Sequence, residues 1–245
     1  MKALLVTSQV TFVPENYSRF VNRALTSPHI SGLLILKNRS LGIFFKGFLM
    51  WVSGKAPNLG WNLMKNTILS FFDSRVTEAR KRHKTLYFSE TINDPQLVPE
   101  FRNFDLIFNA RTRFIFKKDV LDAPKLGCLN IHHGLLPDQR GVFCDLWAKF
   151  EGRPAGFSLH KMSPKIDDGE ILRTQEVPVD PGESFIQHTW RSSEIEALVA
   201  LEVLEEIARK NQIQGKANLK TPQTRYFKNP SSGDLKKFKS MDFVL

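Results

Sequence analysis

The sequence predicts an α/β fold with a Rossmann-like, mostly parallel sheet that carries helices on both faces. Three observations lead to this class. Short apolar runs of strand length recur along the chain, stretches of helical pattern separate them, and 245 residues with 42% hydrophobic content can bury one core of this kind. Strands joined through intervening helices run parallel, because a long crossover returns the chain to the starting edge.

The first half of the chain supplies the inner strands of this sheet. Residues 2–7 are predicted to form a buried first strand, followed by a helix over residues 15–25. Residues 31–36 make a second apolar run that ends in a polar turn. Residues 104–108 and 128–131 are predicted to be the third and fourth inner strands.

The second half extends the sheet and closes the domain. Residues 157–162 and 175–179 are expected to be later strands, with a short helix around residues 145–150. The clearest helix covers residues 192–210: either of its first two serines can cap it, acidic residues occupy its first turn, and Arg-Lys ends it. We therefore expect one domain over residues 1–210 and a polar C-terminal extension over residues 211–245.

The net charge of +10 is concentrated in the N-terminal third of the chain. Residues 1–88 contain 13 Lys/Arg and 3 Asp/Glu, whereas residues 89–245 contain 22 of each. No acidic residue occurs between Glu15 and Asp73. This asymmetry indicates a local anionic partner rather than a generally basic protein.

Residues 41–72 form an apolar stretch between the second and third predicted strands. It is rich in Phe, Leu, Met and Trp, its only charges are Lys46, Lys55 and Lys65, and its apolar runs are too short to span a bilayer. Two amphipathic pieces are expected, followed by a basic cluster. Three interpretations stay open for this insertion, residues 41–84: peripheral membrane contact, a lid over a lipid-linked acceptor, or packing against the sheet or a second copy in a homodimer.

The cysteines and the start of the chain indicate a reducing compartment. Cys128 and Cys144 form neither a disulfide framework nor a metal-ligand pattern, so no metal site is expected. The N-terminal run lacks the basic segment and the cleavage site of a secretory signal. A cytoplasmic protein is expected, located at the inner face of the membrane if residues 41–84 bind lipid.

The residues that can carry chemistry gather in one window, LNIHHGLLPDQRG, over residues 129–141. Asn130 and His132 stand two residues apart at the end of a predicted strand, so their side chains leave the same face. The carboxyl ends of parallel strands are where ligands bind in such sheets. Asp167 and Asp168 follow later, in a glycine-containing turn before an apolar run.

Together these segments resemble a known family. The pattern N-I-H-x-x-L-L-P-x-x-R-G, followed by G-x-x-x-G-x-x-x-H over residues 152–160 and a D-x-G turn, is similar to the catalytic domain of folate-dependent formyltransferases. That family includes methionyl-tRNA, glycinamide ribonucleotide and amino-sugar formyltransferases and formyltetrahydrofolate hydrolase. The resemblance implies 10-formyltetrahydrofolate as the formyl donor, residues 1–210 as the catalytic domain, and Asn130, His132 and Asp167 as the catalytic set.

Each of these residue types suits an acyl transfer in which an amine attacks a formyl carbon. An Asn amide can donate to the developing oxyanion, a His near neutrality can move protons, and a nearby Asp can orient that His. The D-x-G register favours Asp167 over Asp168 for the last role. His133, where the family usually has Pro or a small residue, and His160 are not expected to be catalytic.

The same resemblance implies where the folate binds. The family holds the pterin largely through backbone groups of a segment before the catalytic Asn, which here is Arg113, Phe114, Ile115 and Phe116. The loop from Ser163 to Ile166 is expected to form the opposite wall. Arg140 is a weaker candidate, which either contacts an anionic part of the substrate or braces its own loop.

The acceptor is expected to be the amine of a small molecule. The turn over residues 8–17 contains no glycine that could cradle a ribonucleotide phosphate. The residues after 210 are too few for the barrel domain of formyltransferases that act on initiator tRNA, and the first strand begins without a preceding regulatory domain of the hydrolase kind. An amino sugar, nucleotide- or lipid-linked, is the leading interpretation, and no specific nucleic acid is expected.

Three further functions are compatible with the sequence. Within the family, they are a methionyl-tRNA formyltransferase-like activity and a formyltetrahydrofolate hydrolase activity. From another class, the basic, aromatic N-terminal third would suit a membrane- or nucleic-acid-associated binding protein with a degenerate formyltransferase domain. The intact set of Asn130, His132 and Asp167 speaks against degeneracy.

Overall fold

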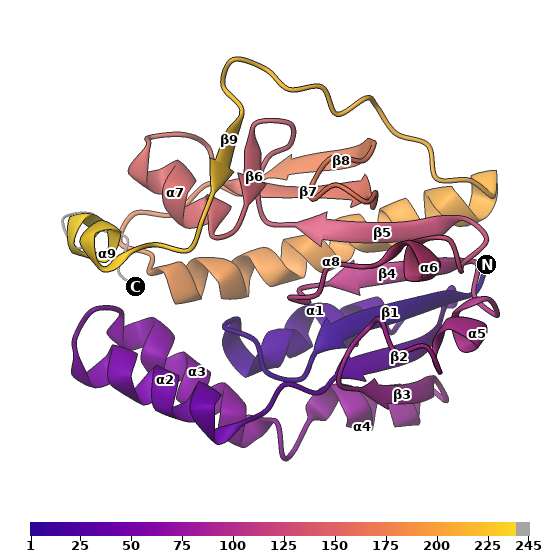
Figure 1. Cartoon of the computed structure of the whole chain (residues 1–245), viewed down its shortest axis with the longest axis horizontal. Helices are drawn as coiled ribbons and strands as arrows, with labels where there is room; N and C mark the ends of the chain where they lie inside the picture. Colours follow the sequence, from indigo (N-terminus) through magenta and orange to yellow (C-terminus); the bar gives the residue numbers. More distant parts are fainter. Residues whose placement is uncertain (239–245) are drawn as a thin grey trace.

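A seven-stranded sheet runs through the computed structural model, which describes residues 1–238 (Figure 1). Its strand order is β3-β2-β1-β4-β5-β7-β8. The strands are β1 (Ala3–Ser8), β2 (Ile30–Leu36), β3 (Thr85–Ser89), β4 (Leu106–Ala110), β5 (Gly127–His132), β7 (Gly156–Lys161) and β8 (Ile171–Glu176). Neighbours from β3 to β5 are parallel, whereas β7 pairs antiparallel with both β5 and β8. The predicted α/β fold with a mostly parallel sheet is confirmed.

Helices cover both faces of the sheet because successive residues of its inner strands point to opposite sides. Ala3 and Leu5 of β1 belong to one buried core, and Leu4 and Val6 belong to the other. The first core lies against α1 (Ser18–Ala24), α4 (Ser74–Lys81) and α8 (Phe185–Lys210), and the second against α5 (Val98–Phe101) and α6 (Lys118–Leu121).

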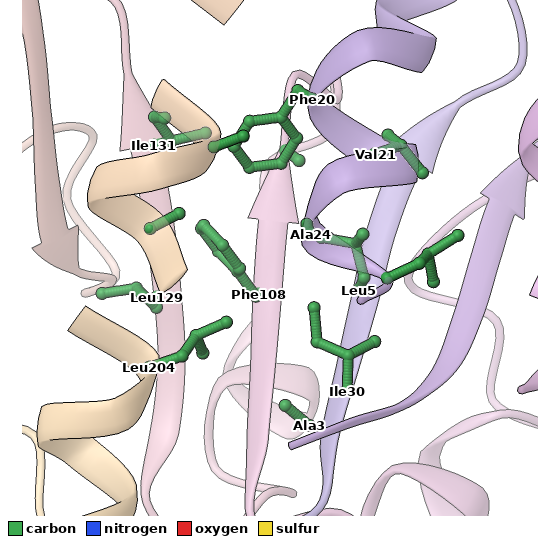
Figure 2. Close-up of a cluster of buried hydrophobic side chains, with 14 of the residues drawn as sticks. Ala3, Leu5, Phe20, Val21, Ala24, Ile30, Phe108, Leu129, Ile131 and Leu204 are labelled. Carbon is green, nitrogen blue, oxygen red and sulfur yellow. The ribbon is translucent and has the colours of Figure 1, made fainter. Parts of the chain in front are cut away.

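The first core is built mainly from large apolar side chains of the inner strands and two helices. Figure 2 shows Phe20 of α1 and Leu204 of α8 gathered around Phe108 of β4. Burying each such side chain contributes about 1.5–3 kcal/mol relative to leaving it exposed. This packing fixes the position of β4 and β5, whose carboxyl ends carry the polar residues described below.

The helix α8 begins seven residues before its predicted start. Ser184 caps it: its side chain accepts a hydrogen bond from the Gln187 N–H, and the Gln187 side chain accepts one from the Ser184 N–H. This reciprocal capping box satisfies two N–H groups that a helix start leaves free. Ser192 and Ser193, the predicted caps, lie buried inside the helix.

Two other elements differ from the sequence prediction. β8 covers Ile171–Glu176 instead of residues 175–179, because its antiparallel register with β7 ends where Glu176 pairs with Gly156. The edge strand β3 was not predicted, since its side chains are mostly exposed or half-buried and show no run of buried positions. The predicted helix over residues 15–25 is a 3₁₀ turn (Pro14–Tyr17) followed by α1.

Residues 41–72 form two helices as expected, α2 (Leu41–Val52) and α3 (Pro57–Leu69). α2 differs from the expected amphipathic piece, because it is apolar all round with a single lysine. Ser40 caps α2 by accepting from the Ile43 N–H. Gly47 and Gly60 let the two helices touch, because a Cβ at Gly60 would lie 2.5 Å from the Gly47 carbonyl oxygen. In residues 1–238 no helix combines the length and the apolar character needed to cross a bilayer.

The chain after α8 returns along the molecule to the carboxyl ends of the strands (Figure 1). There β9 (Arg225–Phe227) pairs in parallel with β6 (Gln139–Gly141). Next, α9 (Ser232–Phe238) packs Phe238 edge-on against Trp147 and Phe150 of α7 (Cys144–Phe150). The polar extension over residues 211–238 is therefore joined to the loop that follows β5; residues 239–245 of the predicted extension lie outside the described residues.

Candidate active site

A cavity of about 570 Å³ opens where the strands β4 and β5 end. It lies at the carboxyl edge of the parallel part of the sheet, the usual place for a ligand in such folds. Nine residues singled out from the sequence line it: Asn130, His132, Asp167, Arg113, Phe114, Ile115, Phe116, Ser163 and Ile166. The helices α2 and α3 contribute a further wall.

Asn130 is held by hydrogen bonds on both ends of its amide. Its Oδ1 accepts from Asn109 Nδ2 at 2.8 Å, and Asn109 in turn accepts from the Thr112 hydroxyl at 2.7 Å. Its Nδ2 donates to His160 Nε2 at 3.0 Å. An amide nitrogen carries two N–H groups, so this arrangement leaves the second one for a molecule in the cavity.

His132 and Asp167 face each other across the cavity wall. His132 Nε2 donates to the Gln139 carbonyl at 2.7 Å, which leaves Nδ1 toward Asp167 Oδ1 at 3.4 Å. The other carboxylate oxygen of Asp167 accepts from the Gly141 N–H at 2.9 Å. Both side chains are buried. The geometry thus pairs His132 with Asp167, the residue that the D-x-G register favours.

Arg140 does not contact the cavity, so the first of its two expected roles, a contact with the substrate, is not supported. It is fully buried and absent from the cavity wall. Its guanidinium forms an ion pair with Asp168 at 2.8 Å and donates to the Asp167 carbonyl and to Asn218. Because these internal partners occupy it, Arg140 braces the turn that carries Asp167, which is the second of the two expected roles.

His160 fixes Asn130 by accepting a hydrogen bond from its amide. Its Nδ1–H donates to the Lys161 carbonyl at 2.9 Å, so Nε2 is free to accept from the Asn130 amide. Burial, together with the nearby His132, lowers the pKa of His160 to about 4. His160 is therefore neutral at pH 7 and fixes the orientation of the Asn130 amide. The G-x-x-x-G-x-x-x-H spacing in the sequence marks this residue but does not reveal what it contacts.

Residues 75–204, more than half of the chain, match the family model described as "Formyl transferase". The chain belongs to the formyl transferase family. This agrees with the resemblance carried by the Asn130, His132 and D-x-G segments.

Known proteins are similar in sequence to parts of this chain. "Methionyl-tRNA formyltransferase" of Syntrophus aciditrophicus is 40% identical over 82 residues, 33% of this chain and 26% of that protein. "Bifunctional polymyxin resistance protein ArnA" of Wigglesworthia glossinidia brevipalpis is 32% identical over 113 residues, 45% of this chain and 17% of that protein. The matches therefore span less than a third of the length of these two relatives.

A solved structure of the family shares the fold. The formyltransferase PseJ from Anoxybacillus kamchatkensis, crystallised with UDP-4,6-dideoxy-4-formamido-L-AltNAc and tetrahydrofolate, superposes with a TM-score of 0.54. The superposition covers 93% of this chain and 85% of that chain at 17% sequence identity. At this identity the superposition shows a common fold and nothing more.

A second polar cluster lies beside the cavity of this formyl transferase domain and was not found by sequence reasoning. Glu196 of α8 is fully buried, with His133 Nδ1 at 3.2 Å, Arg111 Nη2 at 3.7 Å and the Ser192 hydroxyl at 2.6 Å. Tyr17 donates its hydroxyl to the same carboxylate. The signal in the sequence is weak, a single Glu on the apolar face of a long helix.

The charges of this cluster balance each other. Burial raises the pKa of Glu196, but His133 and Arg111 outweigh burial and bring it down to about 2. Burial lowers the pKa of His133 to about 4, with Arg111 adding to the effect. Burial raises the pKa of nearby Asp145 to about 7. Near neutral pH the cluster thus holds an Arg111–Glu196 ion pair beside a neutral imidazole.

Proposed function

We propose that this chain transfers the formyl group of 10-formyltetrahydrofolate to the primary amine of a small molecule, an amino sugar attached to a nucleotide or a lipid. One observation carries the proposal: Asn130, His132 and Asp167, brought from two distant segments, meet on the wall of a single cavity. The tetrahydrofolate and the formamido sugar in the related PseJ structure support the donor and the acceptor class.

The side chains of this wall match the needs of an acyl transfer. An oxyanion develops on the formyl oxygen under attack, and the second N–H of Asn130 can donate to it; such a donor contributes about 10²–10³-fold in rate. His132 Nδ1 can take a proton from the attacking amine, since its Nε2–H stays bound to Gln139. Asp167, 3.4 Å away, stabilises the imidazolium that results.

The segment from Arg113 to Phe116 fits the folate. It has no regular secondary structure and lines the cavity with apolar side chains. Within residues 1–238, the main-chain N–H and C=O groups of Phe114 and Phe116 have no hydrogen-bond partner, so they are open to a polar ring edge. The segment is anchored by Asn93, which donates to the Ile115 carbonyl at 2.9 Å and accepts from the Lys117 N–H at 2.8 Å. The folate supplies the formyl group and the leaving nitrogen.

A methionyl-tRNA formyltransferase-like activity is the second candidate. The 40% identity to the Syntrophus enzyme over 82 residues favours it, as does the positive charge of residues 1–88. A hydrolase of the same family would need only water as the acceptor, and a binding protein with a degenerate site would need no acceptor.

An acceptor panel distinguishes these four possibilities. The protein is incubated with 10-formyltetrahydrofolate and, separately, a nucleotide-linked amino sugar, a lipid-linked amino sugar, initiator methionyl-tRNA, or water alone, and loss of the formyl donor is followed. We expect turnover with an amino sugar, and we expect His132→Asn to lower it by roughly 10²-fold or more. Turnover with the tRNA would replace the proposed acceptor, formate release in water alone would indicate a hydrolase, and no turnover with any acceptor would contradict enzymatic function.

A further inference from the structure

The hairpin of α2 and α3, here called the apolar hairpin (residues 41–72), leaves a large apolar surface uncovered. Of the 18 large hydrophobic side chains exposed in the described part of the chain, 10 lie in this hairpin. They include Phe45, Leu49, Trp51, Trp61, Phe71 and Phe72. Apolar surface concentrated in this way marks an interaction site, because scattered single residues would need no explanation.

The helix α2 carries much of this exposed apolar surface. It is apolar around its whole circumference, with one lysine in LGIFFKGFLMWV, and its only buried residue is Gly47. Gly47 lies against Gly60 and Met64 of α3, so α2 rests on α3 (Figure 1). Ile43, Phe44 and Met50 are half-buried, and the remaining residues of α2 apart from Gly47 are exposed. A helix that is apolar all round is normally enclosed by protein or by lipid.

The charge on the apolar hairpin selects an anionic partner. Between residues 37 and 72 there are five basic residues and no acidic one, and Lys46, Lys55 and Lys65 are exposed. A two-fold contact between two copies of this chain would place this positive surface against itself, which costs energy. An anionic bilayer offers apolar depth and negative charge at once, and tryptophans such as Trp51 and Trp61 suit its interface.

We infer that the apolar hairpin docks this chain on the surface of a bilayer that contains anionic phospholipid. Its exposed aromatic and aliphatic side chains enter the headgroup region, and its lysines contact lipid phosphates. Lys46, Met50, Leu59 and Leu63 of the same hairpin line the cavity. Docking therefore brings the cavity next to the bilayer surface.

Vesicle sedimentation tests this inference on the full chain without reference to catalysis. The protein is mixed with vesicles of phosphatidylcholine, or of phosphatidylcholine with phosphatidylglycerol, at low and high salt. We expect binding to the anionic vesicles that weakens with salt. Trp51→Ser/Trp61→Ser and Lys55→Glu/Lys65→Glu should each lower partitioning by about tenfold or more.

Two control variants make the same kinds of change outside the apolar hairpin. Leu219→Ser removes an exposed leucine outside the hairpin, and Lys210→Glu/Lys216→Glu reverses two exposed charges at and beyond the end of α8. Both should bind as the unmodified chain does. If the hairpin variants fail to fold, quenching of tryptophan fluorescence by brominated lipid in the unmodified chain still reports insertion.

Three outcomes would overturn the inference. The first is no sedimentation with anionic vesicles and no quenching. The second is equal loss of binding in the control variants, which would indicate general basicity. The third is a concentration-dependent dimer that Trp51→Ser/Trp61→Ser abolishes, without vesicle binding, which would assign the hairpin to a second copy of the chain.

Discussion

Asn130 and His132 are each fixed by hydrogen bonds inside the protein, and each keeps one further hydrogen-bonding group for a bound molecule. Asn130 commits one N–H to His160 and its oxygen to Asn109, and His132 commits Nε2–H to the Gln139 carbonyl. The remaining Asn130 N–H and His132 Nδ1 are thereby oriented before a substrate arrives. Preorganised dipoles of this kind lower a barrier without reorganisation during the reaction.

Replacing His132 tests this arrangement directly. We expect His132→Asn to lower turnover by roughly 10²-fold or more while the thermal unfolding of the protein stays two-state. Asn130→Ala and Asp167→Ala should cause similar losses, and the losses should not add, because the three side chains act as one unit. His83→Asn, at an exposed position, is the control. Near-normal turnover of His132→Asn with the true acceptor would refute the assigned role.

Asp145 offers a test based on pH. Burial raises its pKa to about 7, so the folded chain binds this proton more tightly than the unfolded chain, whose Asp has a pKa of about 3.9. The resulting stability is fully present below about pH 4 and is lost as the pH rises through about 7.

Asp145→Asn should therefore gain stability relative to the unmodified chain as the pH is raised. Between pH 5 and pH 8 the difference in the free energy of unfolding should change by on the order of 3 kcal/mol in favour of the variant. Urea unfolding at several pH values measures it, with exposed Asp119→Asn as the control. A pH-independent difference would show that Asp145 is ionised normally in the folded chain.

At the scale of elements, the irregular segment after β4 helps to form the cavity, as the ends of the strands do. Residues 113–116 lie between β4 and α6 without entering either, and within residues 1–238 the main-chain groups of Phe114 and Phe116 have no hydrogen-bond partner. A regular helix or strand would have consumed these groups in its own hydrogen bonds. The loop is therefore suited to recognise a flat polar ring through the main chain.

Folate binding should be visible in the thermal stability of the protein. Reduced folates are expected to raise the unfolding temperature, since a ligand at 100 times its Kd stabilises the folded state by about 2.7 kcal/mol. Ile115→Asp should abolish this shift by placing a charge in the apolar wall. Leu219→Asp, an exposed residue away from the cavity, should retain it. No shift with millimolar folate in the unmodified chain would contradict the proposed donor.

At the scale of the whole molecule, the C-terminal segment is part of what holds the site together. Asn218 accepts from Arg140 and donates to the Asp167 carbonyl, and β9 pairs with β6 directly beside these residues. Gly141 allows this pairing, since its φ is +99° and a Cβ there would lie 2.1 Å from the Phe227 carbonyl oxygen.

Gly141→Ala should consequently disturb the site through the backbone that contacts Asp167. We expect a loss of about 1–3 kcal/mol in the free energy of unfolding and a fall in turnover, because the Gly141 N–H also binds Asp167. Gly152→Ala is the matched control: its φ is also positive, +67°, but a Cβ there meets nothing within 4 Å. It should cost stability without changing the turnover of the folded fraction. Equal turnover losses in both variants would exclude a specific link to Asp167.

Local sequence patterns were enough to predict the fold class and the location of its inner strands. The inner strands are mostly buried runs of apolar residues, and such runs are easily recognised in the sequence. They are β1, β2, β4, β5 and β7. Edge strand β3 and the start of α8 were not predicted correctly. A half-exposed strand carries little periodic signal, and several serines compete as the cap unless the reciprocal bonds of Ser184 and Gln187 are known.

The sequence by itself determined nine residues of the cavity lining, among them Asn130, His132 and Asp167, because they belong to motifs with fixed local spacings. It did not reveal lining residues such as Ser8, Lys46 and Leu63, which come from the N-terminal third of the chain. Only the tertiary structure decided what those residues touch. Arg140 turned inward to Asp168 and Asn218, His160 came behind Asn130, and Glu196 of α8 reached Arg111 and His133. The physical reason is that these contacts join residues far apart in the chain, and their geometry depends on how helices pack on the sheet.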